Sequence, residues 1–146
     1  MGKTNKKTKQ EYTPVVEKKT KQEKDPGNYD SQKASWRFHR FWEKSTWPLN
    51  VNKWKDWEKE ILPKLIENQE LTWADIKGKK NHNVDLSGLT KAGEKELERL
   101  NLDIDRVFSL RLTGKKRIIG ILDRGVLEII CYTPNHEFTQ SNLKHT

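Results

Sequence analysis

The stretch RVFSLRLTGKKRIIGILDRGVLEIICYT, residues 106–133, decides the fold of this 146-residue chain. Three segments rich in apolar residues, 107–112, 117–122 and 126–132, are separated by two short turns that each contain glycine. Such segments are typical of a three-stranded antiparallel meander. The first segment alternates apolar and polar residues, whereas the other two are nearly continuous apolar runs. We therefore expect a sheet that helices cover on one face and partly shield on the other.

Upstream of the meander the apolar spacing changes to that of helices. Thr90 can cap a helix that carries Leu97 and Leu100 on one face. Thr72 and Asp75 have the spacing of a capping box, which predicts a short helical turn after residue 72. Between these two helices we expect residues 77–83 to form a basic loop.

The region from residue 36 to residue 73 is unusually rich in tryptophan. It contains all six tryptophans of the chain, Trp36, Trp42, Trp47, Trp54, Trp57 and Trp73. The spacing predicts helical turns around Trp36 and a helix that Asn52 caps and that Pro63 kinks or splits. We therefore predict an α+β fold, with N-terminal Trp-rich helices packed on a C-terminal three- or four-stranded antiparallel sheet.

Charge divides the chain into two parts. Residues 1–33 contain nine Lys and five acidic residues but few bulky apolar ones, which predicts a disordered basic tail. Residues 34–146 are expected to form a single α+β domain. The formal net charge of the whole chain is +8, which favours a polyanionic partner such as nucleic acid. No apolar stretch is long enough to cross a membrane, so we expect a soluble, cytoplasmic protein.

Several common kinds of site lack their usual signatures in this sequence. There is no GxxxxGK[ST], GxGxxG or GxSxG motif, which disfavours nucleotide hydrolysis, dinucleotide binding and α/β-hydrolase chemistry. The four histidines show no paired ligand spacing, so we expect no metal and no other cofactor. The single cysteine, Cys131, lies in an apolar run and is expected to be a buried thiol.

Two arginines on neighbouring strands are the first candidates for a functional site. Arg111 and Arg117 flank the first turn of the predicted meander and should lie nearly opposite one another. Two like charges in this position cost energy unless an anion or a carboxylate lies between them. A phosphate would fit both guanidinium groups. The alternative is that Glu128 on the third strand neutralises Arg117.

Two histidines in loops are candidates for proton transfer. His136 follows the third strand of the meander, where a side chain is more often merely exposed. Beside two arginines and a phosphodiester, however, it could serve as the general acid or base for cleavage of RNA by its own 2′-hydroxyl. His82, in the basic loop, is a second candidate for the same role.

The segment RIIGILDRGVLEIICYTPNHEFTQ, residues 117–140, together with the helix and strand before it, resembles the RelE/ParE-like toxin family of bacterial toxin–antitoxin systems. The resemblance covers roughly residues 90–140, whereas the Trp-rich half and the basic tail depart from the family. It implies a metal-independent endoribonuclease toxin that acts on messenger RNA, with Arg111 and Arg117 as a phosphate clamp and His136 as acid or base. Tyr132 would stack on a base or assist proton transfer.

The resemblance also implies RNA, often on the ribosome, and a cognate antitoxin protein as partners. The further basic residues expected to hold nucleic acid are Lys79, Lys80, Lys115, Lys116, Arg124 and Lys144. The competing interpretation is a non-catalytic nucleic-acid-binding or protein-interaction module, in which the same basic face only grips phosphates. Loss of His136 separates the two, because only a nuclease needs that imidazole.

Overall fold

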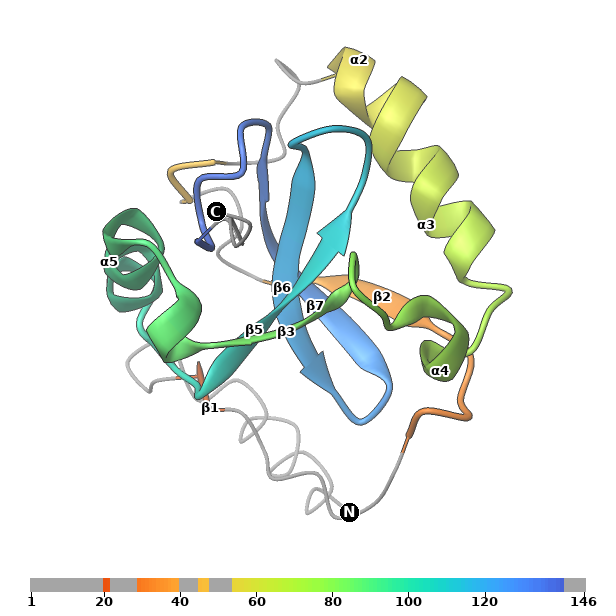
Figure 1. Ribbon diagram of the computed structural model, residues 1–146, viewed down its shortest axis with the longest axis horizontal. Helices are drawn as coiled ribbons and strands as arrows, with labels where there is room; N and C mark the ends of the chain where they lie inside the picture. Colours follow the sequence, from red (N-terminus) through yellow and green to blue (C-terminus); the bar gives the residue numbers. More distant parts are fainter. Residues whose placement is uncertain (1–19, 22–28, 40–44, 48–53, 141–146) are drawn as a thin grey trace, which may run out of the picture.

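A five-stranded mixed sheet forms the centre of the computed structural model, which describes residues 20–21, 29–39, 45–47 and 54–140 (Figure 1). Its strand order is β2-β7-β6-β5-β3, with β2 parallel to β7 and the other pairs antiparallel. The strands are β2 (Ser35–Phe38), β3 (His82–Asp85), β5 (Arg106–Arg111), β6 (Arg117–Asp123) and β7 (Val126–Thr133). Together with the helices described below, this sheet makes an α+β fold, as the sequence predicts.

The meander β5-β6-β7 lies where the sequence places it. Gly114 and Gly125 occupy the two turns with φ angles of 59° and 84°. These left-handed conformations cost a glycine little, which explains why each turn contains one. The register of β6 against β7 shifts between Ile119 and Gly120, so a bulge interrupts this pair.

Helices lie on both sides of the sheet (Figure 1). One side carries a helical segment made of α2 (Trp54–Asp56), the π-helical turn η3 (Trp57–Ile61) and α3 (Leu62–Asn68), followed by α4 (Trp73–Ile76). The other side carries α5 (Lys91–Arg99), which follows the 3-10 turn η4 (Leu86–Gly88). Thr72 and Asp75 cap α4 reciprocally, and the Thr90 side chain accepts a hydrogen bond from Gly93 N at 2.9 Å. Both predicted caps are therefore confirmed.

Two hydrophobic cores result, one on each face of the sheet. Successive residues of a strand point to opposite faces, so Val107 and Phe108 belong to different cores. The α3-side core contains, among others, Ile61, Leu65, Trp73, Phe108, Leu110, Ile118, Ile129 and Tyr132. The α5-side core contains, among others, Leu97, Leu100, Val107, Ile119, Ile130, Cys131 and Phe138. Cys131 is fully buried, as the sequence predicts, and burial raises the pKa of its thiol.

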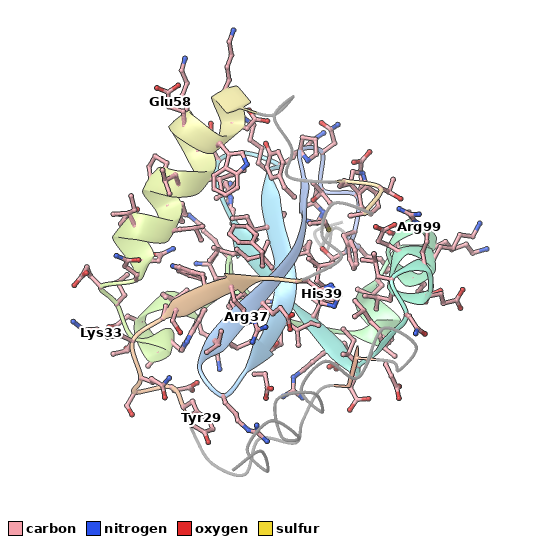
Figure 2. The ribbon with its side chains drawn as sticks, turned by 180° about the vertical axis from the view of Figure 1, so that it is seen from behind. Tyr29, Lys33, Arg37, His39, Glu58 and Arg99 are labelled. Carbon is pink, nitrogen blue, oxygen red and sulfur yellow. The ribbon has the colours of Figure 1, made fainter. Side chains whose placement is uncertain are left out.

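The sheet is larger than predicted, and it is not purely antiparallel. Residues 35–38, expected in helical turns, form β2, which pairs in parallel with the edge of β7 (Figure 2). Part of the expected basic loop forms β3, in which His82 pairs with Ser109. Both strands have four residues, and both gain their hydrogen bonds from strands that are distant in sequence, so local patterns do not reveal them.

The folded part of the chain begins before residue 34. Ala74 N donates to Asp30 O at 2.8 Å and Trp73 N donates to Gln32 O at 3.1 Å, so residues 29–33 pack against α4. In addition, β1 (Thr20–Lys21) pairs with β4 (Leu102–Asp103). The predicted boundary at residue 33 is therefore wrong for residues 29–33, because these backbone hydrogen bonds and the ion pair of Asp30 with Lys77 hold a segment that contains few apolar side chains. The rest of the predicted tail lies outside the described residues.

The helical segment in which the sequence predicts a kink or a split at Pro63 continues through this residue. Residues 54–68 are helical throughout, but η3 precedes Pro63, and Leu62 N bonds to Trp57 O five residues back. Pro63 itself lies in the first turn of α3, where its missing N–H is tolerated. The predicted cap Asn52 lies outside the described residues. Within the described part of the chain, no helix has the length and apolar character required to cross a membrane.

Candidate nucleic-acid interface

A basic groove of about 760 Å³ opens on the α5 side of the sheet. Three separate segments contribute its walls: the end of the 77–81 loop with β3, the β5-β6 hairpin, and the chain that follows β7. The lining residues are Lys79, Lys80, His82, Val84, Gly88, Ser109, Arg111, Lys115, Arg117, Asn135, His136, Thr139 and Gln140. Arg111, Arg117, His82 and His136, all predicted from the sequence, thus lie in one groove.

Arg111 and Arg117 are direct cross-strand partners of β5 and β6. Partners in an antiparallel pair point to the same face, so the two guanidinium groups share one side of the sheet. Arg117 Nη1 donates to Gly114 O at 2.8 Å and to Lys116 O at 3.0 Å, which holds its side chain over the hairpin. Burial, and then the charge of Arg111, lower the pKa of Arg117. The predicted like-charge pair is therefore present.

Glu128 does not neutralise this pair. On β7 the residue opposite Arg117 is Thr133, whereas Glu128 pairs with Ile121, four residues further along β6. Within the described residues, neither Arg111 nor Arg117 forms an ion pair with a carboxylate. The Glu128 alternative is therefore wrong, because the antiparallel register carries Glu128 towards the other end of the sheet.

The chain after β7 brings His136 to the groove. His136 has a φ of 58°, a left-handed conformation that is uncommon outside glycine. The segment behind it is firmly attached, because Thr90 Oγ1 donates to Glu137 O at 2.7 Å and Thr90 N donates to Phe138 O at 3.0 Å. Phe138 is fully buried in the α5-side core. Thr90 therefore anchors this chain segment next to His136.

On the opposite wall, the 77–81 loop and β3 supply Lys79, Lys80 and His82. Asn81 fixes this loop: its Oδ1 accepts from Arg111 N at 2.8 Å, and its Nδ2 donates to Ile76 O at 3.0 Å. His82 is exposed, and its Nδ1 lies 3.0 Å from Asn83 O. The backbone pairing of β3 with β5 thus ends at His82, and beyond it the side-chain amide of Asn81 binds the backbone of β5.

The charged side chains that line the groove are of one sign. Of the described residues that line it, five are cationic, Lys79, Lys80, Arg111, Lys115 and Arg117, and none is Asp or Glu. Such a surface attracts phosphate groups and releases counterions when they bind. The guanidinium and ammonium groups bind phosphate oxygens, and the two imidazoles can carry protons near neutral pH.

Tyr132 is not part of the groove, which corrects the expectation that it joins the site. Its side chain is fully buried in the α3-side core, on the opposite face of the sheet from Arg117. Its hydroxyl donates to Asp56 Oδ2 at 2.9 Å. Burial, followed by the hydrogen bond to Asp56, raises its pKa far above the ordinary value. A residue so enclosed can neither stack on a base nor exchange protons with a substrate.

Two of the predicted nucleic-acid-binding residues, Lys116 and Arg124, also lie elsewhere. Lys116 points to the other side of the hairpin, where its Nζ is 3.2 Å from Glu60 Oε2 and 3.9 Å from Asp56 Oδ1. Arg124 is in the β6-β7 turn, at the far end of the sheet from the β5-β6 hairpin. Lys144 lies outside the described residues. By contrast, Lys79, Lys80 and Lys115 line the groove.

The structure adds polar lining residues that sequence reasoning missed. Ser109 lies on β5 two residues before Arg111 and therefore points to the same face. That spacing of two was visible in the sequence and would have identified it. Asn135, Thr139 and Gln140 join the groove only because the chain after β7 folds back against residues 88–90. No pattern in the sequence predicts that the chain after β7 folds back in this way.

The chain matches none of the models of known protein families, and searches of curated proteins and of solved structures likewise found no match. The resemblance to RelE/ParE-like toxins therefore remains an expectation from the sequence. Within the described residues there is no group of three or more His, Cys, Asp or Glu side chains suited to hold a metal ion.

Proposed function

We propose that this chain is a metal-independent endoribonuclease that acts on messenger RNA. One observation carries the proposal: two opposed arginines and two histidines from three separate segments line one groove, and none of the described residues that line it has a carboxylate. Arginine pairs are well suited to a phosphodiester, because each guanidinium can donate two parallel hydrogen bonds to phosphate oxygens. Imidazole is the side chain best suited to proton transfer near neutral pH.

In the proposed reaction the RNA supplies its own nucleophile. One imidazole takes the proton from a 2′-hydroxyl, whose oxygen attacks the adjacent phosphorus as the bond to the 5′-oxygen breaks. The other imidazole gives a proton to that departing oxygen, so that a cyclic phosphate and a 5′-hydroxyl remain. Arg111 and Arg117 stabilise the charge that develops on the phosphate. DNA lacks the 2′-hydroxyl and is not cleaved by this route.

Two further parts of the proposal come from the sequence resemblance. A messenger RNA substrate places the protein in the cytoplasm, and the ribosome is then a site where that substrate is met. A cognate antitoxin that covers the groove is the expected protein partner. Both are tested with the purified protein by adding ribosomes to the cleavage assay described below and by searching for a partner that suppresses it.

One observation favours the alternative, a module that binds nucleic acid without cleaving it. A catalytic imidazole is usually oriented by a hydrogen-bonding side chain. Among the described residues, however, the only hydrogen bond of either groove imidazole joins His82 Nδ1 to a backbone carbonyl. In the binding module the histidines would add contacts to RNA, and the basic side chains would supply the affinity.

Removal of the His136 imidazole separates the two functions. We expect His136→Asn to lower RNA cleavage in the presence of EDTA by about 100-fold, the scale of losing a general acid or base, with little change in affinity. Asparagine is the better replacement because it tolerates the left-handed backbone that His136 adopts, and His136→Ala serves as a second variant. Cleavage is measured on labelled RNA, and affinity on an RNA with 2′-O-methyl groups.

The control for this experiment is Arg124→Ala, which removes a basic side chain at the far end of the sheet and should leave cleavage unchanged. Arg117→Ala should weaken both affinity and turnover, because a phosphate clamp acts in the bound state and in the transition state. Wild-type protein that binds RNA but does not cleave it would establish the binding module. Full activity in both His136 variants would remove His136 from the mechanism.

A further inference from the structure

A second, smaller hollow of about 290 Å³ adjoins the groove at the β5-β6 hairpin. Its lining residues are Lys64, Lys80, Asn81, Arg111, Leu112, Thr113 and Gly114. Lys80 and Arg111 line both the groove and the hollow. The two spaces are therefore neighbours that share a rim of two cationic side chains.

The groove and the hollow face different sides of the sheet. The groove contains Ser109 and Arg117, which point to the face that α5 covers. The hollow contains Leu112, a member of the α3-side core, and Lys64, which belongs to α3 on the opposite side of the sheet. A ligand that fills both spaces must therefore pass around the edge of the sheet.

A loop, and not a strand, lies along the sheet edge at this point. Pairing of β3 with β5 ends at His82 and Ser109, and among the described residues no strand pairs with β5 beyond them. The backbone N–H of Arg111 is instead satisfied by the Asn81 side chain. A ligand that occupies both spaces would pass Lys80 and Arg111, which line both, beside the Asn81 side chain.

We propose that the hollow is a second phosphate-binding subsite for the same nucleic acid strand, and that the ligand is single-stranded. This inference rests on the proposed function of the groove. Lys64, Lys80 and Arg111 give the hollow a positive charge, and its lining contains no acidic residue from the described part of the chain. A duplex cannot follow the turn around a strand edge, since its persistence length is on the order of 150 base pairs. A single strand bends freely at each nucleotide and can place successive phosphates in the two spaces.

Ligand length and Lys64 together test the proposal. The probes are a trinucleotide, a single-stranded decamer and a duplex decamer, all with 2′-O-methyl groups that prevent cleavage. We expect the single-stranded decamer to bind more tightly than the trinucleotide and than the duplex. Lys64→Ala should weaken binding of the decamer roughly fivefold and leave the trinucleotide unchanged, because only the longer ligand reaches the hollow.

Lys59→Ala is the matched control. Lys59 is exposed on the same helical segment and lines neither space, so its loss removes one charge without touching the proposed path. Equal effects of Lys64→Ala and Lys59→Ala on the decamer, or equal affinities for the decamer and the duplex, would overturn the second subsite. If Arg117→Ala still weakened binding in that case, the function proposed for the groove would stand. Failure of all three probes to bind would overturn both proposals.

Discussion

Glu96 shows how a buried carboxylate is held in this fold. It lies on the inner face of α5 and is only 2% exposed. Thr46 donates to it twice, from its backbone N and from its hydroxyl, each at 2.7 Å, and Arg99 Nε lies 3.4 Å away. Burial by itself raises the pKa of Glu96, but hydrogen bonds from Thr46 and Ser45 and the charge of Arg99 outweigh it and lower the pKa overall. Glu96 therefore attaches residues 45–47 to α5.

We expect Glu96→Gln to destabilise the protein by about 1–3 kcal/mol at pH 7, because an amide replaces an ionised acceptor of several hydrogen bonds. The folded-state pKa is lower than the unfolded one. The stabilisation is therefore complete above the unfolded value, about 4.3, and is lost as the pH falls through the folded value. Urea unfolding at pH 7 and at pH 3 measures both effects, and the deficit of the variant should shrink at the lower pH.

The control for Glu96 is Glu94→Gln, which changes an exposed carboxylate of the same helix and should move the stability by less than about 0.5 kcal/mol. A deficit of Glu96→Gln that stayed the same at pH 3 would contradict the role of the ionised form.

At this scale, sequence reasoning succeeds where a residue acts on its close neighbours. Thr72 with Asp75 and Thr90 with Gly93 are separated by three positions, so their spacing alone predicts the caps. Tyr132 fails for the opposite reason. Its position near the end of the third apolar run does not reveal which face it points to, since the bulge in β7 shifts the alternation there.

At the scale of elements, the cap of α5 connects the helix to the groove. Thr90 accepts from Gly93 N and donates to Glu137 O, one residue after His136. Gly93 faces Phe138 so closely that a Cβ there would collide with the Phe138 carbonyl. The start of α5 and the segment that carries His136 therefore form one unit.

We expect Thr90→Val to cost about 1 kcal/mol of stability, the usual price of a lost helix cap, and in addition to lower RNA cleavage. The second effect follows because Glu137 O loses its donor and His136 is no longer held in place. Stability is measured by urea unfolding, and cleavage with the assay in EDTA. A variant that kept full activity would show that the position of His136 does not depend on this contact.

Thr72→Val provides the comparison for Thr90. It removes the matching cap of α4, on the other side of the sheet from the groove, and should cost a similar amount of stability. Its cleavage rate should equal that of the wild type. If both variants lost activity equally, the loss of cleavage in Thr90→Val would be explained by reduced stability alone.

Elements that depend on local patterns could be predicted, and those that depend on distant partners could not. The meander and α5 follow from their own residues. By contrast, β2 exists because the edge of β7, more than 80 residues later in the chain, offers it backbone partners. In Figure 2, Arg37 is labelled on β2, the edge strand beside β7, and His39 just after it. His39 N continues the pairing by donating to Ile129 O at 2.8 Å.

At the scale of the whole molecule, the sequence reveals the sign of the charge but not where it gathers. A net charge of +8 predicts a polyanionic partner without indicating a surface. The fold sorts the basic residues of the hairpin into two kinds. Lys115 lines the groove, where none of the described lining residues is acidic. Lys116, by contrast, is paired with Glu60 and Asp56 on the other side of the hairpin. Only the three-dimensional arrangement distinguishes these adjacent lysines.

This sorting predicts the salt dependence of RNA binding. For a single strand, the logarithm of the binding constant should fall with the logarithm of salt concentration by about 0.7 per phosphate that is neutralised. Five cationic side chains line the groove, so contact with three to five phosphates implies a slope between roughly −2 and −3.5. We expect Lys115→Ala to reduce the magnitude of the slope by about 0.7, and Lys116→Ala to leave it unchanged because Lys116 already neutralises Glu60. Titrations of a 2′-O-methyl RNA at several salt concentrations measure the slope for the wild type and for each variant. Equal slopes for the two variants would mean that the nucleic acid does not occupy the α5 side of the sheet.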